Sequence, residues 1–222
     1  MSNNTHVLKQ HYEPRSLSDG TLGDTLLIGL SYHFTSLEKT GLAAMLAKLP
    51  LVSDAPIAMD IDLSCIVLDK SMQVVEKIWY GNLRNANESI RHQGDALVGA
   101  KSFEESLIAQ EQIQLRLNEL PNTAKHLLVV LNSYHNQPLR AADKGIIHLG
   151  DKDNPKAHSI SFSQIEPDCK TLIAWQLSYE DNGWQLHTPM QALKLGKLAS
   201  QSIDGISKAA SDFLQNSNNN RW

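Results

Sequence analysis

The middle of the sequence is a succession of short apolar segments separated by turn-forming residues, and this pattern limits the choice of fold more than any other feature. Within residues 59–68, polar Asp60 and Asp62 alternate with apolar neighbours, which is the two-residue period of a β-strand. Further strands are expected at 25–30, 73–79, 112–117, 126–132, 145–149, 159–162, 172–179 and 184–187. Because these strands do not alternate with helices, we predict a mainly β fold, an antiparallel β-sandwich.

Three regions with other patterns accompany these strands. Residues 1–24 are polar and broken by glycine and proline, so we expect a segment with at most one short strand near Val7. A short inserted helix is expected at 37–50, where apolar residues recur near helical spacing before a proline. Apolar residues three to four apart predict an amphipathic C-terminal helix over about 192–214. The expected organisation is a polar N-terminal segment (1–24), a sandwich domain (25–193), and a C-terminal helix with a frayed tail (194–222).

The C-terminal helix has two interpretations. Its apolar stripe either docks on the chain's own sandwich or faces a partner, which includes a homo-oligomer formed through this helix. Its polar side mixes lysines such as Lys208 with acidic residues such as Asp204 and Asp212, which disfavours adsorption to a membrane.

The composition excludes several classes of protein. With 20 Lys and Arg against 24 Asp and Glu, the 222-residue chain has a formal net charge of −4, whereas a general nucleic-acid binder is normally basic. No apolar run approaches the roughly 20 residues that cross a bilayer. The first ten residues lack the apolar stretch of a secretion signal, so we expect a cytoplasmic protein. Cys65 and Cys169 are expected to be buried thiols.

Asp60 and Asp62 are the most distinctive candidates for a functional site. Residues two apart on a strand point to the same face, so the two carboxylates repel unless a cation or a basic side chain compensates them. One interpretation is a solvated sheet face with a neighbouring Lys or Arg. The other is a cation site, and calcium takes about six to eight oxygen ligands. Further oxygen donors occur downstream at Asn82, Asp95, Glu104, Glu105 and Glu111. Such donors suit calcium or magnesium rather than zinc or copper.

Five segments, in this order and spacing, resemble the TerD family of tellurium-resistance and stress-response proteins. They are DIDLSCIVLD, WYGNL, HQGDALVG, EQIQLRLNELP and HLLVVLNSY, and the later TLIAWQLSYEDNGWQLHTPMQAL is similar to the closing hairpin of that family. The resemblance covers roughly residues 25–193. It implies a β-sandwich, a calcium-binding loop cluster and no established enzymatic activity. It also implies a role in resistance to tellurite and other stresses, with partners among other resistance proteins, including membrane-associated ones.

The resemblance places the metal ligands at Asp60, Asp62, Asn82, Asp95 and Glu111. The sequence also departs from the family pattern. Gly81 stands where the family has a first asparagine, and Ala96 and Val98 replace polar loop residues. Extra residues have entered this loop, so Glu104 and Glu105 are candidate substitutes. Because affinity in such sites follows the charge of the ligands, we expect one weakened calcium site.

Enzymatic motifs are missing from the sequence. The segment GDALVGAKS is similar to a phosphate-binding loop, but Ala100 separates Gly99 from Lys101 and no buried parallel strand precedes the segment. The histidines show no metalloprotease spacing, and no nucleophile elbow is present. Asp60 and Asp62 remain a formal acid/base pair without a recognisable substrate pocket.

The sequence therefore predicts a non-catalytic, calcium-responsive or calcium-stabilised module of a stress or tellurite-resistance system that recruits protein partners. The alternative is a metal-independent structural or assembly subunit that has kept the sandwich and lost the calcium sites. An enzyme acting on a small anionic or metalloid compound is the third interpretation.

Overall fold

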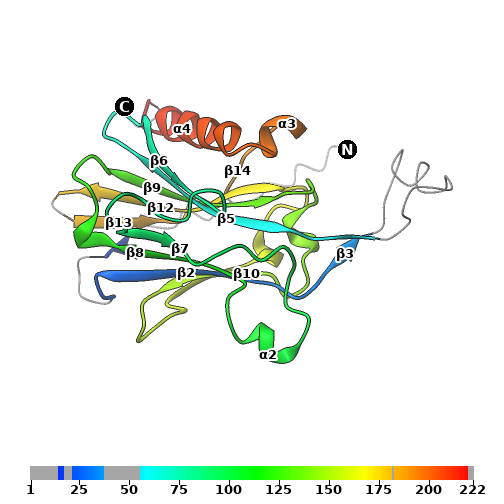
Figure 1. Cartoon of the computed structure of the whole chain (residues 1–222). Coiled ribbons are helices and arrows are strands. Elements are labelled where there is room, and N and C mark those ends of the chain that lie inside the picture. The colour runs from blue at the N-terminus through cyan, green and yellow to red at the C-terminus, as the bar shows by residue number, and fades with distance from the viewer. Residues whose placement is uncertain (1–14, 18–21, 38–55, 182, 220–222) are drawn as a thin grey trace, which may run out of the picture.

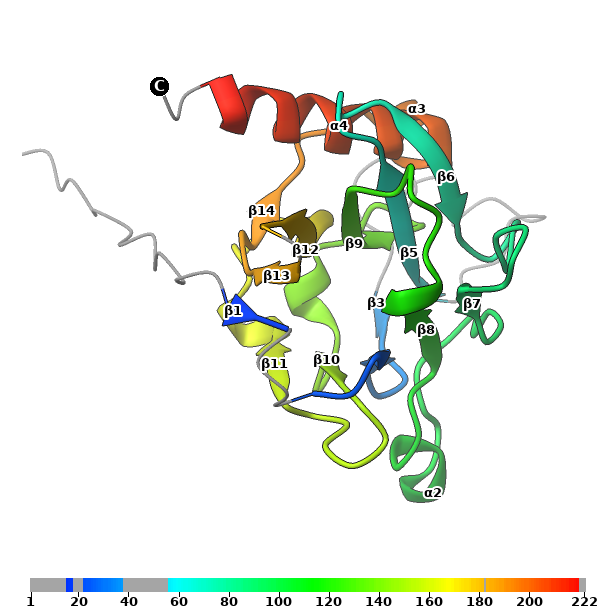
Figure 2. The same ribbon diagram turned by 90° about the vertical axis from the view of Figure 1, so that its left-hand side faces the viewer.

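Two antiparallel sheets, packed face to face, contain most of the residues described by the computed structural model, which are 15–17, 22–37, 56–181 and 183–219 (Figures 1 and 2). Among these residues the first sheet has the strand order β1-β13-β12-β9-β5-β6, with β14 paired to β12, and the second has the order β11-β10-β2-β8-β7. Strands β3 and β4 form a separate pair. The predicted antiparallel β-sandwich is confirmed.

The strands of the first sheet are β1 (Arg15–Ser16), β5 (Ile61–Leu68), β6 (Val74–Ile78), β9 (His126–Ser133), β12 (Thr171–Glu180), β13 (Gly183–His187) and β14 (Gln191–Ala192). Those of the second are β2 (Thr25–Ser31), β7 (Ile90–His92), β8 (Glu111–Arg116), β10 (Ile146–Gly150) and β11 (His158–Ser161). The small pair is β3 (Ser36–Leu37) and β4 (Ile57–Ala58), and the helices are α2 (Phe103–Ser106), α3 (Lys197–Ser200) and α4 (Ile203–Asn219).

Strand β5 is buried on both of its faces, which the sequence alternation did not predict. Ile61, Leu63 and Cys65 enter the main core between the two sheets. Ile66 and Leu68 lie on the other face, in a second apolar cluster. Asp62 shares that second face, because side chains two apart on a strand point the same way.

Helix α4 lies across the outer face of the first sheet, and in both views it forms a third layer (Figures 1 and 2). Its Ile206 and Ala210 complete the second cluster with side chains from β5, β9 and β12. The apolar stripe of the helix thus docks on its own sandwich, the first of the two interpretations. A homo-oligomer through α4 would have to use the outer side of the helix.

The predicted bounds of the C-terminal helix are wrong at its start. The described chain is extended at β14, forms the single turn of α3 and begins α4 only at Ile203. Leu193 and Leu195 pack against the second cluster before any helix begins, so their spacing reflected a shared apolar surface rather than a helix. Gly205 lies inside α4, where a Cβ would come within 2.5 Å of the Ala199 carbonyl oxygen, so it permits the close approach of α3.

Other expectations have mixed outcomes. Strand β1, which pairs with β13, lies within the segment expected to be an N-terminal tail. Strand β7 and helix α2 were not predicted, and α2 projects from the side of the molecule opposite α4 (Figure 1). The helix expected at 37–50 lies outside the described residues except for Leu37, which belongs to strand β3, and the strand expected near Val7 also lies outside them. None of the described helices is long and apolar enough to cross a membrane.

Candidate functional site: an acidic cluster at the sandwich rim

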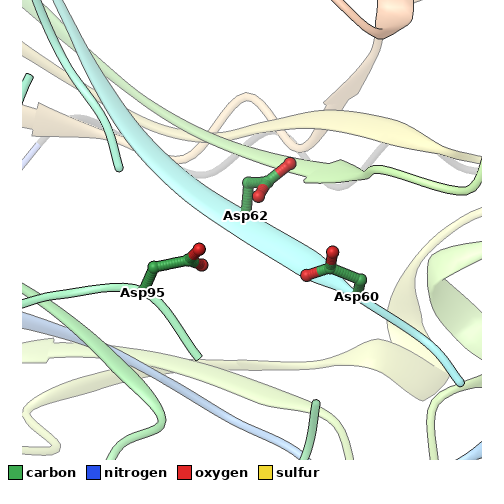
Figure 3. A group of neighbouring side chains, drawn as sticks. All are labelled: Asp60, Asp62 and Asp95. Atoms are coloured by element: carbon green, nitrogen blue, oxygen red, sulfur yellow. The ribbon is translucent and has the colours of Figure 1, made fainter. Parts of the chain in front are cut away.

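Asp60, Asp62 and Asp95 converge at one rim of the sandwich and form what we call the acidic cluster (Figure 3). Asp60 immediately precedes β5, Asp62 is the second residue of β5, and Asp95 lies in the loop that follows β7 of the other sheet. One carboxylate oxygen from each residue lies within 4.8 Å of those of the other two. The cluster therefore brings together residues from the two sheets, and all three of its side chains are carboxylates.

Burial and mutual repulsion oppose ionisation in this cluster. Burial raises the pKa of Asp62 from 3.8 to about 8, and the nearby Glu111 and Asp60 charges add to the rise, which an Asn132 hydrogen bond partly offsets. Burial also raises the pKa of Asp60 from 3.8 to about 6, with the Asp95 charge adding to the rise and His135 opposing it. In the absence of a cation, the ionised form of Asp62 is therefore disfavoured near neutral pH.

No lysine or arginine pairs with the cluster within the described part of the chain. None of the ion pairs found there joins Asp60, Asp62 or Asp95 to a lysine or an arginine. Asp62 is only 7% exposed, so it does not lie on a solvated face of the sheet. Of the two interpretations of the aspartate pair, the solvated face with a basic neighbour does not describe these residues.

The donor set fits a hard divalent cation. The Oδ1 atom of Asp60 is buried and has no hydrogen-bond partner, and buried polar atoms are normally paired. Three carboxylates offer six oxygen atoms, and carboxylate oxygens are the ligands that calcium and magnesium prefer. Asp60, Asp62 and Asp95 are the residues that would hold such an ion.

Glu111 lies next to the acidic cluster, where its carboxyl group interacts with Asp95, and it also has partners outside the cluster. Its Oε2 accepts a hydrogen bond from the Leu63 amide at 2.7 Å and lies 3.3 Å from Nε2 of His92, and both side chains are almost wholly buried. His92 Nε2 also lies 3.1 Å from the Leu63 carbonyl oxygen. The amide of Gly94 donates to His92 Nδ1, so that nitrogen carries no proton and Nε2 is the donor.

This arrangement has a structural cause. Strand β6 pairs with β5 only from Cys65 to Leu68, so the backbone at Leu63 has no strand partner on that side. Glu111 and His92 of the second sheet satisfy the Leu63 amide and carbonyl in place of a strand. His92 is not among the predicted ligands. The alternation of buried Ile90 and His92 around exposed Arg91 could have revealed it as a strand residue facing inward.

The remaining predicted ligands do not lie in the acidic cluster. Asn82 is exposed, and its amide nitrogen donates to the Lys77 carbonyl at 2.8 Å and to Glu76 at 3.2 Å. Glu104 and Glu105 belong to α2 and are exposed, and Glu105 accepts a hydrogen bond from the Lys101 amide at 2.6 Å. Among the described histidines, cysteines, aspartates and glutamates, the three aspartates are the only group of three or more whose ligand atoms all lie within 4.8 Å of one another.

Two features of the sequence gain a local explanation. A Cβ at Gly81 would come within 2.5 Å of the Trp79 ring, so an asparagine would not fit at this position without a shift of that ring.

Cys65 and Cys169 are buried, as predicted, and burial raises the pKa of each thiol to about 12.

Comparisons with known proteins point to one family. The model of the TerD domain family matches residues 27–200. The tellurium resistance protein TerZ of Serratia marcescens is 23% identical over 95 residues, which are 43% of this chain and 47% of that protein, so the chain spans about half the length of the curated relative it matches.

Solved structures share the fold at very low identity. A crystal structure of a homologue of telluride resistance protein (TerD) from Streptomyces coelicolor A3(2) superposes with a TM-score of 0.61 at 8% identity, covering 82% of this chain and 96% of that one. A crystal structure of a protein of unknown function gives a TM-score of 0.61 at 10% identity, with the same coverage. At these identities the likeness concerns the fold.

Proposed function

The chain belongs to the TerD domain family, and from that premise we propose that it is a non-catalytic, calcium-responsive module of a tellurite-resistance or general stress-response system. The observation that carries the proposal is the acidic cluster, in which three carboxylates converge and one buried oxygen atom has no partner. The name of the relative TerZ, a tellurium resistance protein, supports the biological setting.

The position of Asp95 explains how a cation would affect the rest of the protein. Asp60 and Asp62 are held by the first sheet, whereas Asp95 lies in the long loop between β7 and β8. A bound divalent cation supplies the positive charge that lets the three carboxylates remain ionised side by side. Asp95 then ties the loop to the first sheet, and we propose that residues 94–110 become more ordered as a result.

The same loop carries the surface that we assign to partner proteins. Leu97, Phe103, Leu107 and Ile108, which we call the apolar loop patch, are each at least 67% exposed. Exposed apolar side chains gathered in one segment are typical of protein–protein contacts. We propose that calcium presents this patch to other resistance proteins, including membrane-associated ones.

Thermal unfolding in metal-free buffer and in calcium tests the cation site. Binding to the native state at about ten times Kd adds about 1.4 kcal/mol, which raises Tm by roughly 3–6 °C in a domain of this size. We expect this rise in the wild type and its loss in Asp60→Ala and Asp95→Ala. Glu104→Ala, Glu105→Ala and Asn82→Ala are matched controls that should keep it.

The result also separates the proposal from its alternative. If millimolar calcium leaves Tm unchanged while sodium chloride of equal ionic strength does the same, the cation site is wrong and the metal-independent assembly subunit is favoured. If calcium acts through the loop, hydrogen exchange of amides 94–110 should slow on its addition in the wild type and not in Asp95→Ala.

A further inference from the structure

A second candidate site lies on the outer face of the second sheet, away from the layer formed by α4. It is a pocket of about 410 Å³ between the end of β2, the loop that carries α2, and β10 with the loop that follows it. Ligand pockets for small molecules commonly begin at about 300 Å³. The pocket is therefore large enough to enclose a small molecule or part of one.

The charge of this pocket is opposite to that of the acidic cluster. Its lining includes the exposed lysines Lys144 and Lys156 and the histidines His33 and His148, and it includes no aspartate or glutamate. The chain as a whole is acidic, with a net charge of −4, so a pocket lined only by basic and neutral groups differs from the average surface. Its wall at Leu107 and Ile108 is apolar.

The floor of the pocket depends on a glycine in the middle of a strand. Gly29 of β2 lies opposite His148 of β10, and a Cβ at Gly29 would come within 2.3 Å of His148 Nε2. A glycine inside a strand weakens it and often marks a close approach of other groups. Here it makes room for the imidazole ring of His148, which lines the pocket.

His148 itself is not satisfied by the protein. The residue is 7% exposed, and its Nδ1 atom is buried without a hydrogen-bond partner. Burial, with the charge of Lys156 in addition, lowers the pKa of His148 and so favours the neutral form of the ring. An unpaired ring nitrogen of this kind costs stability unless a further group binds to the histidine.

We propose that this pocket binds the oxyanion group of a small molecule, a phosphate or a carboxylate, between Lys144, Lys156 and His148. The lysines supply the attraction, and the imidazole supplies a hydrogen bond at the base. The apolar wall at Leu107 and Ile108 accommodates a short carbon skeleton attached to the anion. The acidic cluster could not accept the same ligand, because its three carboxylates repel it.

NMR titration of the ¹⁵N-labelled full chain tests this site. The probes are inorganic phosphate, phenyl phosphate and benzoate, added at constant ionic strength in buffer freed of metal by a chelating resin, because a soluble chelator is itself a polyanion. We expect saturable shifts at the Gly29 amide and the His148 ring. A stronger response to phenyl phosphate or to benzoate distinguishes a phosphate from a carboxylate ligand.

Charge-matched variants separate the pocket from general electrostatics. Lys144 has a φ of 49°, which asparagine tolerates better than most residues, so the test pair is Lys144→Asn with Lys156→Gln. The control pair, Lys70→Gln with Lys152→Gln, removes the same charge from exposed lysines outside the pocket lining. We expect the test pair to weaken binding at least tenfold, or about 1.4 kcal/mol, and the control pair to leave it unchanged.

Two outcomes would overturn the proposal. One is the lack of saturable shifts at Gly29 and His148 with all three probes. The other is an equal loss of affinity in the test and control pairs, which would mean that the anion responds only to the overall charge.

Discussion

Glu111 and the acidic cluster are neighbouring carboxylates at the same rim, and they differ in what surrounds them. Glu111 and Asp62 are buried, Asp60 is partly buried and Asp95 is exposed. Glu111 accepts a hydrogen bond from the Leu63 amide and contacts the imidazole of His92. In the cluster, Oδ1 of Asp60 has no partner, and no lysine or arginine of the described chain pairs with the three aspartates. A carboxylate with its partners in place holds the fold together, whereas a group of converging carboxylates that leaves a buried oxygen atom unpaired indicates a binding site.

The difference assigns distinct roles to residues that the family resemblance would treat alike. Glu111 and His92 bond to the unpaired edge of β5 and thereby fix the second sheet against the first. His92 Nδ1 also accepts a hydrogen bond from the Gly94 amide, and this bond positions the start of the loop that bears Asp95. We therefore interpret Glu111 and His92 as residues that position the acidic cluster, and the three aspartates as its ligands.

The largest effect is expected from Glu111→Ala. Leaving a buried hydrogen-bonding group without its partner typically costs about 1–3 kcal/mol, and here the Leu63 amide loses its acceptor while His92 Nε2 loses one of its two. Urea unfolding should show this loss both in calcium and in metal-free buffer. Glu105→Ala, which removes a carboxylate from exposed α2, is the matched control and should change stability by less than about 0.5 kcal/mol.

A different result would move Glu111 into the ligand set. If Glu111→Ala unfolds like the wild type in metal-free buffer and has lost only the stabilisation by calcium, then the carboxylate binds the ion directly, and the contrast between the two groups fails.

Asp62→Asn should have a smaller effect of the opposite sign in metal-free buffer. The asparagine side chain carries no charge, whereas burial and the neighbouring Glu111 and Asp60 carboxylates disfavour the negative charge of Asp62. A shift of one pKa unit corresponds to about 1.4 kcal/mol. We expect a gain of about 1–2 kcal/mol at pH 8 without metal, together with the loss of the calcium response. A variant that is destabilised without metal would show that Asp62 is a structural residue like Glu111.

The sandwich could be predicted because its evidence is local. Alternating and apolar segments bounded by turn residues gave the position of most strands, including β5, β9 and β12, to within one or two residues. Strand β7 was not predicted because it has only three residues. The start of the C-terminal helix was misplaced because Leu193 and Leu195 reach the second apolar cluster before any helix begins.

The site was harder to predict because its properties depend on distant segments. The spacing of Asp60 and Asp62 correctly indicated two adjacent carboxylates, and Asp95 was correctly grouped with them. The partners of Glu111 could not be inferred, since they depend on where β6 stops pairing with β5. The burial of Asp62 depends on the packing around β5, and the pocket at His148 depends on a contact between β2 and β10.

The pH dependence of stability should distinguish the two groups most finely. The folded-state pKa values of about 8 for Asp62 and about 6 for Asp60 lie above the ordinary 3.8, so between about pH 4 and pH 8 the folded protein binds more protons than the unfolded chain. Stability in metal-free buffer should therefore fall as the pH rises through this window. Calcium binds the ionised carboxylates, so the rise in Tm that it causes should be small at pH 5 and larger at pH 8.

The comparison with Asp62→Asn isolates this contribution. Burial lowers the pKa of His126 and His148, and such histidines add stability as the pH rises toward 6.5, which opposes the effect of the aspartates. The measurement is therefore the difference between the wild type and Asp62→Asn in metal-free urea unfolding from pH 5 to pH 8. We expect the variant's advantage to grow by about 1 kcal/mol over this range. A constant difference would mean that Asp62 does not titrate there, and that its charge is already compensated within the protein.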